Sequence, residues 1–235
     1  MLPKIDYPIY KIKVPSMGKE QQFRPFLVKE EKLLLMAKES SNPKDVLGAI
    51  KQVINNCCME KKLDVNKLTI FDLEYVFLKL RAISVENTIK VSYRDTEDNN
   101  VYDFDVDLEK VEMIYPKKVS NTIKITEKSG ITMKYPPASL YEDEEFLNLE
   151  SDQLFELISR CIESVYYEDN VYTTDQYKRE ELSEFVESLD IKTFEAIQSF
   201  LLSAPKMEYR IKYKNSLGHD REIVLSSLND FFTWR

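Results

Sequence analysis

Three aspartates, Asp103, Asp105 and Asp107, alternate with apolar residues along one short stretch of the sequence. Alternation places them on one face of a strand, and carboxylate oxygens are the ligands that hard divalent cations prefer. A calcium loop would also need a central glycine and a ligand from another element, and neither is visible. We therefore interpret the three aspartates as a solvated strand face and predict no metal site. A divalent-metal-dependent enzyme that uses these acids is the alternative from a different functional class.

Histidine and cysteine are scarce, with one histidine, His219, and three cysteines, Cys57, Cys58 and Cys161. They lack the CxxC or HxxxH spacing that is typical of structural zinc. His219 lies in SLGHDRE, between two alternating segments, so we expect it at an exposed hairpin tip. Four glycines in the whole chain leave no glycine-rich phosphate loop, Rossmann turn or nucleophile elbow. We predict no catalytic residue, no cofactor and no enzymatic activity, with free thiols in a reducing cytoplasm.

The elements that would position these side chains follow from the hydrophobic periodicity. Alternation predicts an opening hairpin over 8–26 and a second one over 89–106, around the turn DTEDNN. Helical spacing predicts three helices between these hairpins, over 28–39, 43–57 and 69–82.

The second half of the chain repeats this order of elements. A strand, a glycine-containing turn and a strand occupy 122–139, and helical stripes and a final alternating hairpin follow. We therefore predict an internal duplication. The predicted fold class is α+β, with two similar lobes, 1–116 and 117–235, each built from short antiparallel β-hairpins packed with α-helices. The second lobe would carry an insertion near 166–190.

The net charge of −8 comes from 33 lysines and arginines against 41 aspartates and glutamates. It argues against sequence-independent binding of nucleic acid, which needs a basic face. The acids concentrate in residues 141–195, which hold 17 acidic and 4 basic side chains. We expect this region to select a basic protein partner or to bind a second copy of the chain. The candidate acidic face comprises Glu142, Asp143, Glu144, Glu145, Glu180, Glu181, Glu184 and Glu187.

Two long strings distinguish the sequence: FRPFLVKEEKLLLMAKES at 23–40 and KLTIFDLEYVFLKLRAISV at 67–85. In these strings the chain resembles the baseplate hub protein family of T-even-like contractile-tailed bacteriophages, most strongly over 2–115. The resemblance implies a role in virion morphogenesis, as a hub component or as an assembly chaperone. It implies neither an enzymatic activity nor a cofactor.

Aromatic residues at three places are candidates for binding a partner. Each group is either part of a core or a docking surface. For the FRPF segment we favour the core, because Arg24 can extend toward solvent while the rings pack inward. The candidates are Phe23, Arg24, Pro25, Phe26, Phe71, Tyr75, Phe231, Phe232 and Trp234.

The expected function is therefore that of a baseplate hub assembly factor or chaperone, which binds other hub proteins or the tape-measure protein in the host cytoplasm. A permanent structural subunit of the virion baseplate hub is the alternative within this class. Charged residues interrupt the apolar positions at the start of the sequence, so we expect no membrane-spanning segment there.

Overall fold

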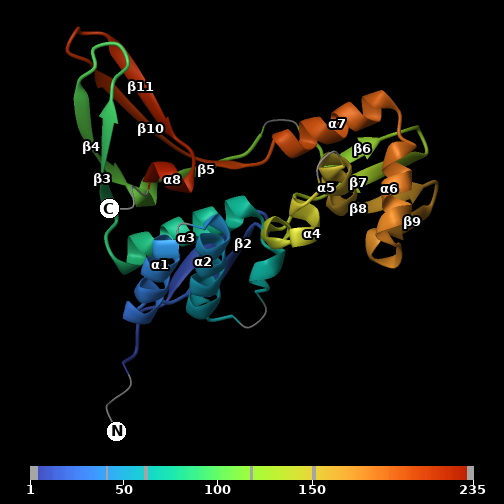
Figure 1. The fold of residues 1–235 in the computed structure, drawn as a ribbon, viewed down its shortest axis with the longest axis horizontal. Coiled ribbons are helices and arrows are strands. Elements are labelled where there is room, and N and C mark those ends of the chain that lie inside the picture. The colour runs from blue at the N-terminus through green and yellow to red at the C-terminus, as the bar shows by residue number, and fades with distance from the viewer. Residues whose placement is uncertain (1–4, 41, 61–62, 117–118, 150–151, 232–235) are drawn as a thin grey trace. The chain divides into compact units, whose positions relative to one another are not determined.

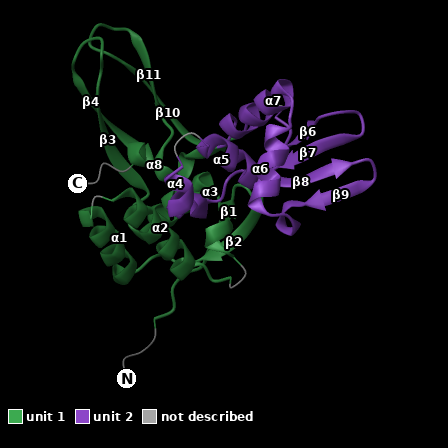
Figure 2. Cartoon of the chain, turned by 45° about the vertical axis from the view of Figure 1, so that its right-hand side comes forward, with its two compact units in different colours: residues 1–114, 206–235 green, residues 115–205 purple. Residues whose placement is uncertain are grey.

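The computed structural model describes residues 5–40, 42–60, 63–116, 119–149 and 152–231 (Figure 1). The chain forms two compact units (Figure 2). Unit 1 combines Met1–Ile114 with Lys206–Arg235, and unit 2 is Tyr115–Pro205. The chain therefore leaves unit 1 once, forms unit 2, and returns to complete unit 1.

Unit 1 begins with an antiparallel hairpin and three helices whose starts are set by short polar side chains. Asn42 accepts a hydrogen bond from the N–H of Lys44 at 3.0 Å, and Pro43 fits the first helical turn. Thr69 and Asp72 form a capping box at the start of the third helix. The elements are β1 (Tyr10–Val14), β2 (Lys19–Phe23), α1 (Val28–Ser40), α2 (Pro43–Cys57), the 3-10 helix η1 (Val65–Lys67) and α3 (Ile70–Ser84).

Asp72 also joins α3 to the first hairpin. Its carboxylate is buried and accepts hydrogen bonds from the N–H of Ser16 at 2.8 Å and from the Ser16 hydroxyl at 2.7 Å. The Thr69 hydroxyl donates to the same carboxylate at 2.7 Å. Since a buried carboxylate is costly without donors, these bonds fix the turn between β1 and β2 to the start of α3.

Two hairpins complete unit 1, one from each part of its chain. β3 pairs with β4, while β10 pairs with both β11 and β5. The ring of Tyr213 lies 4.9 Å from that of Tyr102 and 5.1 Å from that of Phe104, so the two hairpins pack against each other. The elements are β3 (Thr88–Arg94), β4 (Val101–Asp107), the 3-10 helix η2 (Leu108–Lys110), β5 (Glu112–Ile114), β10 (Lys206–Lys214), β11 (Asp220–Leu225) and α8 (Leu228–Phe231).

Helix α3 is central to unit 1, because it contacts α2, β1, η2 and β10. Its Val76, Phe77 and Leu78 are buried, and they contribute to the hydrophobic core of the unit. On another face, Lys79 Nζ donates to the carbonyl oxygens of Leu108, Glu109 and Val111 at 2.8–2.9 Å. These bonds hold the connection between β4 and β5 against the helix.

Unit 2 consists of a four-stranded antiparallel sheet, in the order β6–β7–β8–β9, and of helices that share a core with it. Buried side chains from β6, β7, β8, α5, α6 and α7 form one core, which includes Ile131, Ile158, Ile162, Ile197 and Phe200. The elements are β6 (Thr122–Lys124), β7 (Ser129–Met133), η3 (Ala138–Glu142), α4 (Glu144–Leu147), α5 (Gln153–Cys161), β8 (Ile162–Tyr167), β9 (Asn170–Thr173), η4 (Thr174–Gln176), α6 (Arg179–Glu187) and α7 (Ile191–Leu202).

The predicted α+β class, with helices and short antiparallel sheets, is confirmed. The division of the chain differs from the two predicted lobes, because residues 206–235 group with unit 1. The pairing of β10 with β5 joins strands far apart in the sequence, which periodicity does not reveal. The stretch 166–190, predicted as an insertion, contains β9, η4 and the whole of α6. The internal duplication stays a prediction.

Candidate interaction surfaces

The FRPF segment connects β2 to α1, and its two rings point into the core of unit 1. Phe23 and Phe26 are buried, while Pro25 is half-buried. Arg24 lies between the rings and donates from Nη1 to the carbonyl oxygen of Pro25 at 2.8 Å. The segment is therefore engaged within unit 1, in agreement with the core interpretation.

Arg24 pairs with a glutamate that is fully buried. Its Nη2 lies 3.0 Å from Oε1 of Glu30, and the N–H of Leu27 donates to the other oxygen at 2.8 Å. Burial acts to raise the pKa of Glu30, but the hydrogen bonds from Arg24 and Leu27 outweigh it, and the pKa is lowered. Glu30 therefore stays ionised, and Arg24 is held in place by it.

The other aromatic candidates lie mostly inside unit 1. Phe71 and Phe231 are buried, the first on α3 and the second at the end of α8. Tyr75 is half-buried, and Lys79 Nζ lies 5.2 Å from the centre of its ring. The remaining two candidates, Phe232 and Trp234, lie outside the described residues.

The acids at 142–145 are bound largely by neighbours within unit 2. Asp143 caps α4 by accepting a hydrogen bond from the N–H of Glu145 at 3.0 Å, and it binds Arg160 Nη1 at 2.5 Å. The hydrogen bond from Arg160 is the largest cause that lowers the pKa of Asp143. Glu145 pairs with Arg179 at 2.7 Å. Of the other two, Glu142 is half-buried at the end of η3 and Glu144 is exposed in α4.

The acids on α6 are differently placed. Glu181 accepts a hydrogen bond from the N–H of Lys178 at 2.9 Å and so caps the helix. Glu180, Glu184 and Glu187 are exposed, and their spacing places them along one side of the helix. This side of α6 therefore presents three of the eight candidate acids to solvent.

A cleft of about 300 Å³ separates α6 from the end of the sheet in unit 2. Its walls are mainly apolar and aromatic, and Glu181 is the acid that lines it. The principal lining residues are Val165, Tyr172, Tyr177, Glu181, Leu182 and Phe185. The exposed acids of α6 therefore lie on a helix that also forms one wall of an apolar cleft.

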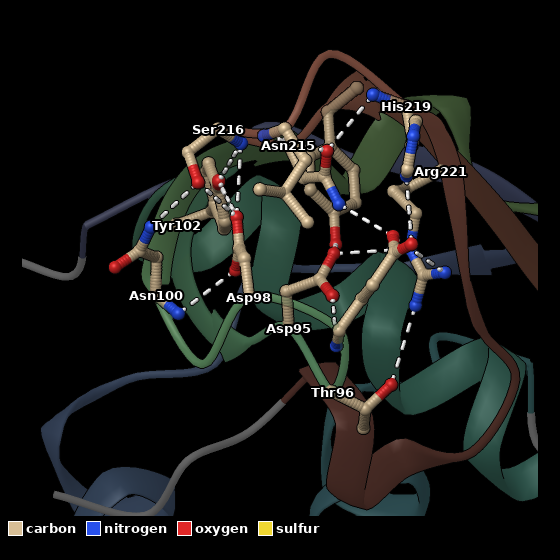
Figure 3. A network of polar contacts seen from close by, with 12 residues as sticks. Asp95, Thr96, Asp98, Asn100, Tyr102, Asn215, Ser216, His219 and Arg221 are labelled. Atoms are coloured by element: carbon tan, nitrogen blue, oxygen red, sulfur yellow. Dashed lines mark hydrogen bonds and ion pairs between the residues drawn. The ribbon is translucent and has the colours of Figure 1, made fainter.

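In unit 1, the turns of the two packed hairpins meet in a network of polar contacts (Figure 3). Asp95, which is buried, accepts a hydrogen bond from the Tyr213 hydroxyl, and Arg221 Nε lies 3.1 Å from the same carboxylate oxygen. The hydrogen bond from Tyr213 is the main cause that lowers the pKa of Asp95. Burial, together with this bond, raises the pKa of Tyr213 to about 12. The ionised aspartate and the neutral tyrosine therefore stabilise each other.

Asp98 forms the second part of the network. It accepts hydrogen bonds from the Tyr102 hydroxyl at 2.5 Å, from the N–H of Ser216 at 2.9 Å and from the Ser216 hydroxyl at 2.8 Å. Burial acts to raise the pKa of Asp98, but these hydrogen bonds outweigh it and the pKa is lowered. Asn100 adds a hydrogen bond to the Ser216 hydroxyl at 3.0 Å.

Glu97 forms the third part. His219 Nδ1 lies 2.7 Å from one of its oxygens, and Asn215 Nδ2 donates to the other oxygen at 2.7 Å. His219 is at the tip of the hairpin, as the sequence predicts, and it takes part in the joint between the hairpins. The acids of this turn are bound by side chains of the other hairpin, so the arrangement is suited to holding the hairpins together.

A family model described as T4 bacteriophage base plate protein matches residues 7–233, which is nearly the whole chain. The chain belongs to this family. No curated protein and no solved structure matches it. The predicted resemblance to phage baseplate proteins is confirmed, and with it a role in the phage baseplate. Family membership implies interaction with other phage proteins and indicates that the protein acts at the tail baseplate. Among the described residues of this baseplate protein, no helix is both long and apolar enough to cross a membrane.

The aspartates considered as metal ligands make local contacts in the baseplate protein. Asp103 accepts a hydrogen bond from the Ser92 hydroxyl at 2.6 Å, and Asp107 pairs with Lys110 at 3.4 Å. Asp105 lies opposite a lysine in the register of β3 and β4. Within the described part of the chain, no group of three or more histidines, cysteines, aspartates or glutamates is placed to hold a metal ion.

The three cysteines are free thiols, as expected. Burial raises the pKa of Cys57 and of Cys161 to about 12 in each case. Cys58 is less buried, and burial also raises its pKa. At neutral pH all three therefore carry the unreactive thiol form.

Sequence reasoning missed the network between the hairpins. Asp95, Glu97 and Asp98 lie in the turn of one hairpin, and Arg221 lies in β11 just after the turn of the other; these acids and this arginine were the available signal. Periodicity identifies each hairpin separately, but it does not say which hairpin packs on which.

Proposed function

We propose that this baseplate protein is a non-enzymatic assembly factor of the baseplate hub, which binds hub proteins or the tape-measure protein while the tail is built in the host cytoplasm. The observation that carries the proposal is the match of the baseplate family model over residues 7–233, because it spans both units of the chain. A protein that matches a baseplate family over nearly its whole given sequence is expected to act through contacts with other baseplate components.

The chemistry of the surfaces supports binding rather than catalysis. The carboxylates between the hairpins are bound to tyrosine, serine, asparagine, histidine and arginine side chains, and so they are not presented to a substrate. The exposed acids of α6 and the adjacent apolar cleft are, by contrast, open to a partner. Exposed charge beside apolar surface is typical of sites that recognise another protein.

Mass spectrometry of purified virions tests the role as an assembly factor. We expect an assembly factor to be present in extracts of infected cells and in hub intermediates. We expect it to be absent from finished particles. Stoichiometric presence in the virion would instead make the protein a permanent structural subunit of the baseplate.

Co-expression with the hub proteins and the tape-measure protein of the same phage tests the partners. We expect the full-length chain to co-purify with at least one of them. A chain that stays monomeric and captures none of them would contradict the proposal.

A further inference from the structure

The last strand of unit 2, β9, is an outer strand of its sheet. It pairs with β8 on one side, and the described strands place no other strand beside it (Figures 1 and 2). All four of its residues, Asn170–Thr173, are exposed, and Val171 retains 67% of its accessible surface. An exposed outer strand is a template for pairing with another chain.

The turn into β9 determines which backbone groups point outward. Tyr167 and Asn170 flank a two-residue turn, Glu168 and Asp169, and are paired in the register of β8 and β9. In such a hairpin the flanking residues exchange both hydrogen bonds, and the next pair along the strands does not. The N–H and C=O of Val171 therefore point away from β8, toward the free edge.

Side chains alternate along β9, so Tyr172 faces the opposite side of the sheet from Val171. Tyr172 lines the cleft of about 300 Å³, together with Tyr177, Leu182 and Phe185. A chain added beside Val171 would run along the edge next to this cleft. Alternate side chains of the added strand would then face the cleft, and the cleft offers room for a large apolar one.

The charge around the cleft limits what the added chain can be. Glu180, Glu184 and Glu187 are exposed along α6, and residues 141–195 hold 17 acidic against 4 basic side chains. Pairing with β9 of a second copy would bring two of these acidic regions together, and like charges oppose such contact. A basic segment would be attracted to the same region.

We propose that β9 and the adjoining cleft bind an extended segment of a baseplate partner that is rich in lysine or arginine, with one apolar side chain seated in the cleft. The segment adds to the sheet as a fifth strand. This inference rests on the proposed function, since it specifies how a partner is bound.

Binding of a synthetic peptide to the full-length protein tests the proposal. The probe is fluorescein-labelled Lys-Val-Lys-Leu-Lys-Val-Lys, followed by fluorescence anisotropy, and the matched control is the peptide with glutamate in place of lysine. We expect the basic peptide alone to bind, and its affinity to fall as salt is raised. Equal binding of both peptides, or of neither, would overturn the proposal.

Charge-reversal variants locate the site. The double variant Glu180→Lys and Glu184→Lys is expected to weaken binding of the basic peptide roughly tenfold. Glu195→Lys is the control and is compared with Glu184→Lys alone, so that the change in net charge is the same; Glu195 is an exposed acid on α7 of the same unit. An equal loss of affinity in the control variant would show that the peptide is attracted to the acidic protein in general. It would overturn the proposed site beside α6.

Variants of Val171 test strand addition. Val171→Pro removes the outward N–H and is expected to abolish binding, whereas Val171→Ala keeps that group and retains most of the binding. Hydrogen exchange should slow in Asn170–Thr173 when the peptide is added. Binding without this protection would overturn the added strand, and a β9-dependent dimer seen by sedimentation would reassign the edge to a second copy.

The same variants separate this proposal from the proposed function. If hub or tape-measure proteins capture the variant chains as well as the unmodified chain, the role in assembly stands and the β9 site is wrong. If they capture none of the chains, while the peptide binds as described, the site stands and the assembly role is wrong.

Discussion

Arg24 and Glu30 form a charged pair beside the core of unit 1, with Lys29 Nζ 3.5 Å from the same glutamate. Arg24→Met keeps much of the side-chain length but, among the described residues, leaves the buried carboxylate with only the exposed Lys29 as a cationic partner. We expect the free energy of unfolding to fall by about 3 kcal/mol, because an unpaired buried charge is costly. Urea unfolding followed by circular dichroism measures the change.

The double variant Arg24→Met and Glu30→Gln provides the control for this pair. Glutamine is neutral and can still accept the hydrogen bond from Leu27, so much of the lost stability should return. If the double variant were less stable than Arg24→Met alone, the buried charge would not be the reason for the loss.

Tyr213 and Asp95 make the joint between the hairpins depend on pH. The lowered pKa of Asp95 contributes stability above the ordinary carboxyl pKa of about 3.9, and this stability is lost as the pH falls below it. The pKa of Tyr213 is raised to about 12, so its contribution is complete below pH of about 10 and is lost as pH rises toward 12.

Tyr213→Phe tests this dependence in urea unfolding across pH. The variant should be less stable at neutral pH, and its difference from the unmodified chain should shrink between pH of about 10 and 12, where the unfolded tyrosine ionises first. If the difference in stability between Tyr213→Phe and the unmodified chain stayed constant over that alkaline range, the raised pKa of Tyr213 would be contradicted.

At the scale of elements, Gly130 on β7 lies close to both neighbouring strands of unit 2. A Cβ on this residue would lie 2.5 Å from the carbonyl oxygen of Ile123 on β6, and it would also clash with the Tyr166 hydroxyl on β8. We expect Gly130→Ala to lower the free energy of unfolding by about 1–3 kcal/mol, since backbone must move. Ser129→Ala, the neighbouring change without such a clash, should cost less in the same measurement.

Helix starts were the most predictable elements, because their signals are local. Asn42 with Pro43, and Thr69 with Asp72, are adjacent or nearly so in the sequence, and the structure uses both pairs as caps. Contacts between distant residues have no such local signal. The hydrogen bond from Ser16 to Asp72 joins residues far apart in the chain, and periodicity does not predict it.

The candidate site shows the same division between local and distant information. The acidity of α6 could be counted from the sequence, and its exposed glutamates lie where helical spacing places them. The cleft beside α6 could not be predicted from the sequence, because residues of β8, β9 and α6 form it only once they have folded together. Among the aromatic candidates, composition alone could not separate buried Phe71 and Phe231 from surface rings.

At the scale of the whole molecule, the chain returns to complete unit 1 after forming unit 2. The order of elements suggested two lobes in sequence, since each half ends with a hairpin. The structure instead pairs β10 with β5 and packs the final hairpin on β3 and β4. Contacts of this kind depend on side chains far apart in the sequence, such as Asp95 and Tyr213. The hydrophobic pattern within each half of the chain does not show that they meet.

Deletion of residues 206–235 should therefore destabilise the β3–β4 hairpin of unit 1 more than the sheet of unit 2. The deletion removes the strand that pairs with β5, and it leaves Asp95 and Asp98 without their partners on the final hairpin. We expect hydrogen exchange to become fast in 88–107 and to stay slow in β7 and β8, whose partners are retained. Ile211→Ala, which shortens one buried side chain of β10, should act in the same direction and more weakly. If exchange rose mainly in β7 and β8 instead, the final hairpin would belong energetically to the second half of the chain, as the order of elements first suggested.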